Sequence, residues 1–171
     1  GEEEIRESGC NHLIFRTSWV YSVHRSNFVK NIIELAKKKN EIKVVNDQIG
    51  APTSAELIAD ITAICLSKVI DKSNKIKNNQ SGLYHLTSQG EISWFDYAKF
   101  VIKNMKKLGS KDLLDIKNIV PVSSSQFSSQ AERPANSRLD TKKIIDTFGV
   151  YLPPWQYHML RVIKELYSKE L

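Results

Sequence analysis

Residues 16–21 are Arg16-Thr17-Ser18-Trp19-Val20-Tyr21, and they close an apolar, β-rich run that begins at residue 12. The turn-forming residues Gly9-Cys10-Asn11 precede this run. The pattern predicts one buried strand over residues 12–21. Ligands of open α/β sheets bind outside the carboxyl ends of the strands. We therefore expect the residues that end this strand to face a ligand.

Helical and strand-like segments alternate after this strand. Apolar residues recur with a helical period over residues 27–39, and a short strand is expected at 41–45. Residues 46–52 are rich in turn formers. Thr53-Ser54-Ala55-Glu56 has the pattern of a capping box that opens a helix running to residue 70. Further strands are expected at 82–87 and 119–122, helices at 93–107, 139–148 and 153–171, and loops at 71–81 and 123–130. This alternation indicates the α/β class.

Composition excludes several classes of protein. The 171 residues carry a net charge of +6, but the lysine runs 37–39 and 106–107 end predicted helices, where they complement the helix dipole. Aromatic residues do not alternate with these lysines, which disfavours nucleic-acid binding. No apolar run approaches the ~20 residues of a membrane span, and the acidic first residues do not resemble a signal peptide. Cys10 and Cys65 lack metal-type spacing, which indicates free thiols in a reducing cytoplasm.

Six short motifs, taken in order and at these spacings, resemble one family. They are residues 16–21, Asn-Phe-Val-Lys at 27–30, Asp-Gln-Ile-Gly-Ala-Pro-Thr at 47–53, Gly-Leu-Tyr-His-Leu at 82–86, Ser-Trp-Phe-Asp at 93–96 and Arg-Pro-Ala-Asn-Ser-Arg-Leu at 133–139. The chain resembles the dTDP-4-dehydrorhamnose reductases, which are extended short-chain dehydrogenase/reductases. The resemblance runs from the first residues to the last predicted helix.

Two motifs of that family are absent from the sequence. The chain contains no Gly-x-x-Gly-x-x-Gly and no Tyr-x-x-x-Lys, both of which lie upstream in the family. The resemblance therefore implies an α/β fold that is the C-terminal, substrate-side portion of such an enzyme, lacking the N-terminal Rossmann glycine-rich half. Residues 1–25 would be the tail of the nucleotide-binding (Rossmann) domain. Residues 26–171 would form mainly the substrate-binding domain, with the helix and strand near 54–87 packing back on the Rossmann sheet.

The family reaction is the last step of dTDP-L-rhamnose synthesis, which serves cell-surface polysaccharides such as the O-antigen of lipopolysaccharide. A hydride passes from NADPH or NADH to the C4 keto group of dTDP-4-dehydro-L-rhamnose, and a Tyr helped by a Lys protonates the forming alkoxide. Gly1-Glu2 resembles the Gly-Glu that follows this Lys. The resemblance implies a cytoplasmic oxidoreductase whose present chain, lacking both residues, is inactive alone.

The first site residues come from the end of the predicted strand. By resemblance, the backbone groups of Thr17 and Ser18 contact the carboxamide edge of the nicotinamide cofactor. Trp19 would present a flat apolar wall to the deoxysugar. The alternative is that Trp19 is a core aromatic residue.

Further substrate ligands are implied by the next two motifs. Asn27 and Lys30 open a helix whose free N–H groups suit a phosphate, although Asn27 also suits a plain N-cap. Gln48 offers a donor and an acceptor for a base edge or a ribose. Gly50 allows a ligand to approach the backbone closely, or is an ordinary turn glycine.

An arginine beside a proline is the strongest candidate for the diphosphate. The guanidinium of Arg133 is a planar fork that matches phosphate oxygens, and related enzymes place an Arg-Pro on the diphosphate. The alternative is a surface arginine, and Arg138 is the second candidate. Two departures affect the substrate loops: Ser22 stands where relatives usually have Gly, and residues 127–131 lack the prolines that relatives often carry.

A metal site is implied by two glutamates. Some members of the family dimerise through Mg²⁺ held by glutamates, and Glu56 and Glu165 match that pattern. The resemblance thus implies Mg²⁺ and a homodimer of the full-length enzyme. The alternatives are a capping-box residue for Glu56 and a solvated helix face for Glu165.

Two other functions stay open at this point. The first is a non-catalytic binding subunit on the same scaffold, like the regulatory subunit of methionine adenosyltransferase. The second is another nucleotide-sugar epimerase or reductase. Trp19 within the Thr-Ser-Trp run favours the rhamnose branch, because general epimerases more often have an Asn-Val-Tyr-Gly run.

Overall fold

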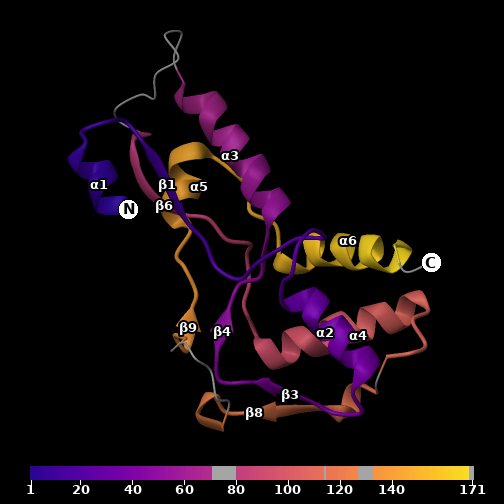
Figure 1. Ribbon diagram of the computed structural model, residues 1–171. Coiled ribbons are helices and arrows are strands. Elements are labelled where there is room, and N and C mark those ends of the chain that lie inside the picture. Colours follow the sequence, from indigo (N-terminus) through magenta and orange to yellow (C-terminus); the bar gives the residue numbers. More distant parts are fainter. Residues whose placement is uncertain (71–79, 114, 127–132, 170–171) are drawn as a thin grey trace.

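The computed structural model describes residues 1–70, 80–113, 115–126 and 133–169. Helices alternate with short strands that pair mostly in parallel, which confirms the α/β class (Figure 1). The predicted loop residues 71–79 and 127–130 and the last two residues of the predicted final helix lie outside the described ranges. Within those ranges, no helix combines the length and hydropathy needed to cross a membrane.

The prediction of one continuous strand over residues 12–21 is wrong, because this segment contains two short strands. The short helix α1 (Glu2–Glu7) leads to β1 (Leu13–Arg16), which pairs in parallel with β6 (Gly82–His85). The chain then breaks, and β2 (Val20–Tyr21) pairs with β5 (Thr53–Ser54). Trp19 causes the break, because its φ of 49° is left-handed and cannot continue a strand.

The segment after β2 follows its prediction. Helix α2 (Phe28–Lys38) begins after the N-cap Asn27, whose side chain accepts a hydrogen bond from the Lys30 backbone N–H. Strand β3 (Ile42–Val45) pairs in parallel with β8 (Ile119–Val122). Local signals were sufficient here because the cap and the apolar period agree.

Helix α3 (Ala55–Val69) begins one residue later than the capping-box pattern predicts. Its N-cap is Ser54, which accepts from the Leu57 N–H. Thr53 lies in β5, where its hydroxyl donates to the Ala51 carbonyl and accepts from the Ser88 N–H. The capping-box prediction is therefore wrong, because strand pairing occupies Thr53 and leaves Glu56 free to contact another helix.

The predicted irregular segment 46–52 contains a short strand at the centre of a small sheet. Strand β4 (Ile49–Gly50) pairs antiparallel with β7 (Ile92–Ser93) and parallel with β9 (Asn136–Ser137). Three segments distant in sequence meet at this sheet, so it holds residues 48–50 close to the start of α4.

The remaining helices lie where the sequence predicts them, with boundaries that shift by up to three residues. Helix α4 (Trp94–Leu108) is capped by Ser93 and ends at Gly109, whose φ is 114°. Helix α5 (Lys142–Phe148) begins three residues later than expected, since residues 139–141 are not helical. Helix α6 (Trp155–Ser168) begins after Pro154.

Buried residues form two hydrophobic cores. The first core lies among α2, α4, α6 and β3, in the lower right half of Figure 1. The second core lies beneath α3, α5 and β6 in the upper half, where Leu13 and Phe15 of β1 pack against it. Within the described part of the segment near 54–87, β6 pairs with β1 and α3 contributes to the second core. The domain boundaries stay a prediction. The first core contains Tyr21, Val23, Val29, Ile32, Ile33, Ala36, Ile42, Val44, Tyr97, Ala98, Val101, Ile102, Met105, Leu113, Ile119, Trp155, Met159, Val162, Ile163 and Leu166. The second contains Leu57, Ile61, Cys65, Val69, Tyr84, Leu86, Ile144, Phe148, Val150 and Leu152.

Candidate functional site

A cavity of about 640 Å³ lies between α2, β3 and the start of α4. Its volume falls within the range of typical small-molecule sites, roughly 300–1,000 Å³. Most of its walls are apolar, and a few polar groups enter from the loops. The lining residues are Phe28, Asn31, Ile32, Leu35, Ile42, Lys43, Val44, Val45, Gln48, Trp94, Ser124, Ser125 and Arg133.

The cavity brings together two of the predicted substrate ligands, Gln48 and Arg133. Gln48 is only 8% exposed, and the described residues offer its side chain no hydrogen-bond partner. Arg133 is exposed and has no ion-pair partner within the described part of the chain. The amide of Gln48 and the guanidinium of Arg133, both on the wall of one cavity, are suited to a polar, anionic ligand.

An aromatic wall of the cavity was not predicted from the sequence. Phe28 and Trp94 both line it, with ring centroids 4.4 Å apart. Trp19 stacks on Trp94, with ring centroids at 3.6 Å and planes inclined by 12°. The start of α4 was recognised as a motif, but its aromatic residues carried no assigned role. An aromatic residue in the first turn of a predicted helix, in a motif shared with the family, was the available signal.

Trp19 supports this wall from behind and does not itself line the cavity. Its left-handed backbone is uncommon for a bulky residue and directs the indole onto Trp94. A Cβ on Gly50 would lie 2.5 Å from Cε2 of the Trp19 ring. The structure thus gives Gly50 the role of admitting the Trp19 indole. The predicted contacts of both residues with the substrate stay untested.

Gly50→Ala should lower the free energy of unfolding by about 1–3 kcal/mol, because the added methyl group overlaps the Trp19 ring. Gly50 does not have a positive φ, so the cost is steric. Chemical denaturation of the variant and of wild type would measure it. In a Trp19→Ala background the same change should be nearly neutral. Equal costs in both backgrounds would contradict the close approach.

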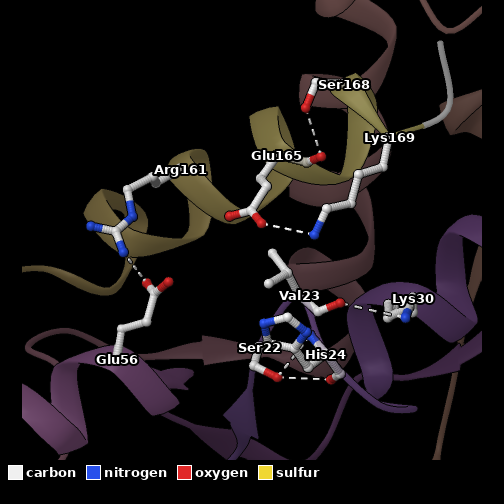
Figure 2. Close-up of polar contacts among 9 residues, drawn as sticks. All are labelled: Ser22, Val23, His24, Lys30, Glu56, Arg161, Glu165, Ser168 and Lys169. Atoms are coloured by element: carbon white, nitrogen blue, oxygen red, sulfur yellow. Dashed lines mark hydrogen bonds and ion pairs between the residues drawn. The ribbon is translucent and has the colours of Figure 1, made fainter.

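The structure uses Asn27 and Lys30 mainly within the loop that precedes α2. The Asn27 amide donates to the Ser22 carbonyl at 2.7 Å, while its oxygen caps the helix. Lys30 Nζ lies 3.5 Å from the Val23 carbonyl oxygen (Figure 2). Neither residue lines the cavity. The N-cap alternative accounts for Asn27, and a phosphate contact by either residue stays a prediction.

Thr17 and Ser18 follow the carboxyl end of β1, the position where open sheets bind ligands. Thr17 is exposed, and Ser18 is half-buried with its hydroxyl 3.3 Å from the Ala51 carbonyl oxygen. Arg138 differs from Arg133 because its guanidinium contacts Asn136 and Glu91, each at 2.9 Å. Arg133 is thus the better candidate for an external anion.

Glu56 and Glu165 are both paired with cations of the chain itself. Glu56 Oε2 lies 2.5 Å from Arg161 Nη2, and Glu165 Oε1 lies 2.9 Å from Lys169 Nζ (Figure 2). The described residues contain no group of three or more His, Cys, Asp or Glu side chains that could hold a metal ion. These residues do not fit Mg²⁺ as they stand, and the homodimer stays a prediction.

Buried polar atoms surround Glu56. Tyr21 and His158 are 2% and 5% exposed, and neither Tyr21 Oη nor His158 Nδ1 has a hydrogen-bond partner in the described structure. Burial raises the pKa of Tyr21 and lowers that of His158, so both side chains are held neutral at pH 7. The hydrogen bond from Lys169 lowers the pKa of Glu165. The negative charge around Glu56 is therefore carried by the carboxylates of Glu56 and Glu165, and not by Tyr21.

The α/β fold, with its mostly parallel strand pairs, agrees with the C-terminal portion of an extended short-chain dehydrogenase/reductase. The family described as the RmlD substrate binding domain matches residues 1–168. The chain belongs to this family.

Named relatives agree with this assignment. dTDP-4-dehydrorhamnose reductase of Escherichia coli strain K12 is 42% identical over 168 residues, which is 98% of this chain and 54% of the relative. The enzyme of the same name from Burkholderia thailandensis is 36% identical, over 99% of this chain and 56% of the relative. The chain thus spans about half the length of the curated relatives it matches.

Solved structures agree as well. The crystal structure of dTDP-4-dehydrorhamnose reductase from Bacillus anthracis, in complex with NADP, superposes with a TM-score of 0.73 at 30% identity. The superposition covers 98% of this chain and 52% of that one. The sequence-based recognition of the family is therefore confirmed.

Proposed function

We propose that this chain is the substrate-binding part of an NADPH- or NADH-dependent reductase that converts dTDP-4-dehydro-L-rhamnose to dTDP-L-rhamnose in the cytoplasm. The names of the similar proteins from E. coli and B. thailandensis support this reaction. They also favour a reductase over a binding subunit like the regulatory subunit of methionine adenosyltransferase.

One observation carries the proposal: Gln48, Arg133 and the aromatic wall share a cavity. A nucleotide-sugar needs a cation for its diphosphate, a polar group for its base edge or ribose, and flat apolar surfaces for its rings. Arg133 supplies the first as a bidentate fork. The Gln48 amide supplies the second as donor and acceptor. Phe28 and Trp94 supply the third.

Thr17 and Ser18 would hold the nicotinamide cofactor, whose presence in the B. anthracis structure supports its use here. When bound, the cofactor supplies the hydride. Both residues fit this role because they follow the carboxyl end of β1, where their backbone groups are free of strand pairing. Trp19 follows directly and orients the wall on which the sugar would rest. Orientation of the two reactants in this way is the contribution of the chain to the rate.

Arg133→Ala should weaken dTDP binding by about 1.5–3 kcal/mol, the scale of hydrogen bonds to charged groups. Arg133→Lys should weaken it less, because the charge stays while the bidentate fork is lost. Isothermal titration of dTDP into the full-length protein and both variants would measure these losses. Thermal melts of each variant would verify that the fold is retained.

Arg138→Ala provides the matched control for this test. Arg138 is an exposed arginine of the same segment, but Asn136 and Glu91 already engage its guanidinium. We expect this variant to bind dTDP as wild type does. Equal affinities for wild type and both Arg133 variants would refute the proposed diphosphate contact. They would also direct the search to Arg138 or Lys30.

A further inference from the structure

The carboxylate of Glu56 lies where helices α3 and α6 meet. It belongs to the first turn of α3 and is half-buried. Arg161, two turns into α6, places Nη2 2.5 Å from Glu56 Oε2, and His158 Nδ1 lies 4.0 Å from the same oxygen (Figure 2). The Arg161 side chain is 59% exposed, so its guanidinium reaches Glu56 from the solvent side.

We propose that the Arg161 guanidinium takes the place of a metal ion at Glu56, so that α3 and α6 are held together without Mg²⁺. Mg²⁺ binds carboxylate oxygens at about 2.1 Å in near-ideal octahedral geometry. An ion at that distance from Glu56 Oε2 would lie within a few ångströms of the guanidinium that contacts the same oxygen. Two cations so close repel each other strongly at a half-buried site.

Among the residues that the structure describes, the other carboxylates near this contact are paired or exposed, so they do not offset this repulsion at the half-buried oxygen. Glu165 lies one turn after Arg161 on α6, and Lys169 pairs with it from the next turn (Figure 2). Asp60 acts electrostatically on Arg161 and His158, but it lies on the exposed face of α3. Tyr21 Oη and His158 Nδ1 are neutral and buried. Among the residues that the structure describes, Arg161 is the cation in contact with Glu56.

The ion pair also affects the region that carries the cavity. Glu56 follows β5, and β5 pairs with β2 directly after Trp19. Helix α6 contacts β5 as well. A fixed α3–α6 contact therefore holds the strand pair from which Trp19 projects, and this arrangement does not depend on the supply of metal.

Thermal melts and calorimetric titrations with MgCl₂ test this inference in the full-length protein. Wild type should bind no Mg²⁺ and should melt at the same temperature in MgCl₂ and in EDTA. Arg161→Gln removes the guanidinium and should lower the melting temperature by about 2–4 °C. MgCl₂ should then raise the melting temperature of this variant, because Glu56 is free to bind the ion.

Three further variants serve as controls. The double variant with Arg161→Gln and Glu56→Gln should stay insensitive to MgCl₂, since the Glu56 carboxylate is gone. Arg161→Lys should behave as wild type does, because it keeps a cation. Lys169→Gln frees Glu165 and leaves the Glu56–Arg161 pair intact. Like wild type, this variant should melt at the same temperature in MgCl₂ and in EDTA.

Two results would overturn the inference. Stoichiometric Mg²⁺ binding by wild type would show that the ion and Arg161 coexist at Glu56. An Arg161→Gln variant that folds and ignores MgCl₂ would show that Glu56 is no cation site at all. If that variant does not fold, the titrations of wild type and Arg161→Lys still decide whether Mg²⁺ binds.

Discussion

The isolated chain of 171 residues should not oxidise NADPH in the presence of dTDP-4-dehydro-L-rhamnose. Its sequence has no Tyr-x-x-x-Lys motif to protonate the forming alkoxide and no glycine-rich loop to hold the cofactor phosphates. Without these two motifs the chain has neither the proton donor nor the loop that holds the cofactor phosphates. The absorbance of NADPH over time, against a control without protein, would measure the rate.

The inactive chain must also be shown to be folded. Circular dichroism and binding of dTDP provide that control, because residues of this chain line the cavity. Turnover well above the control without protein would contradict the expectation. Such turnover would mean that the present sequence contains a proton donor. The chain would then be more than the substrate-binding part of the enzyme.

Trp19→Ala in the full-length enzyme should lower both stability and activity. Removing the indole leaves a space between Trp94 and Gly50, which should cost about 3 kcal/mol of unfolding free energy, the low end for a large aromatic residue because Trp19 is half-buried. The loss of the supported wall should lower kcat/KM by an equivalent of about 1–3 kcal/mol. Denaturation and steady-state kinetics measure the two effects separately.

Trp94→Ala is the companion variant, because it removes the same stacked pair from the other side. A double-mutant cycle then isolates the stacking energy from the contact with substrate. An unchanged kcat/KM for Trp19→Ala, accompanied by a lower melting temperature, would show that Trp19 acts only as a core aromatic residue.

The sequence was sufficient where the signal and the structure were both local. Asn27, Ser93 and Gly109 mark helix ends by their own side chains or backbone angles, and each stands where it was expected. The misplaced elements depend on distant partners. The strand breaks at Trp19 because Trp94 and Gly50 receive its ring, and α3 begins late because Thr53 is engaged by Ala51 and Ser88.

The residues of the candidate site also fall into those that the sequence indicated and those that it did not. The resemblance indicated Gln48 and Arg133, and the structure brings both to one cavity. It did not indicate Phe28 and Trp94, since aromatic residues at helix starts have the same pattern in a core and in a ligand wall. The partner of Glu56 could not be predicted either, because Arg161 lies on a distant helix and no local spacing connects the two.

The separation of the two cores affects how a ligand would act on the whole chain. Cavity walls come from α2, β3 and α4, which belong to the first core, while α3, α5, β1 and β6 surround the second. A ligand that binds only the closed form of a cooperative unit raises the free energy needed to open that unit. An occupied cavity would therefore protect the amide hydrogens of the first core from exchange more than those of the second core.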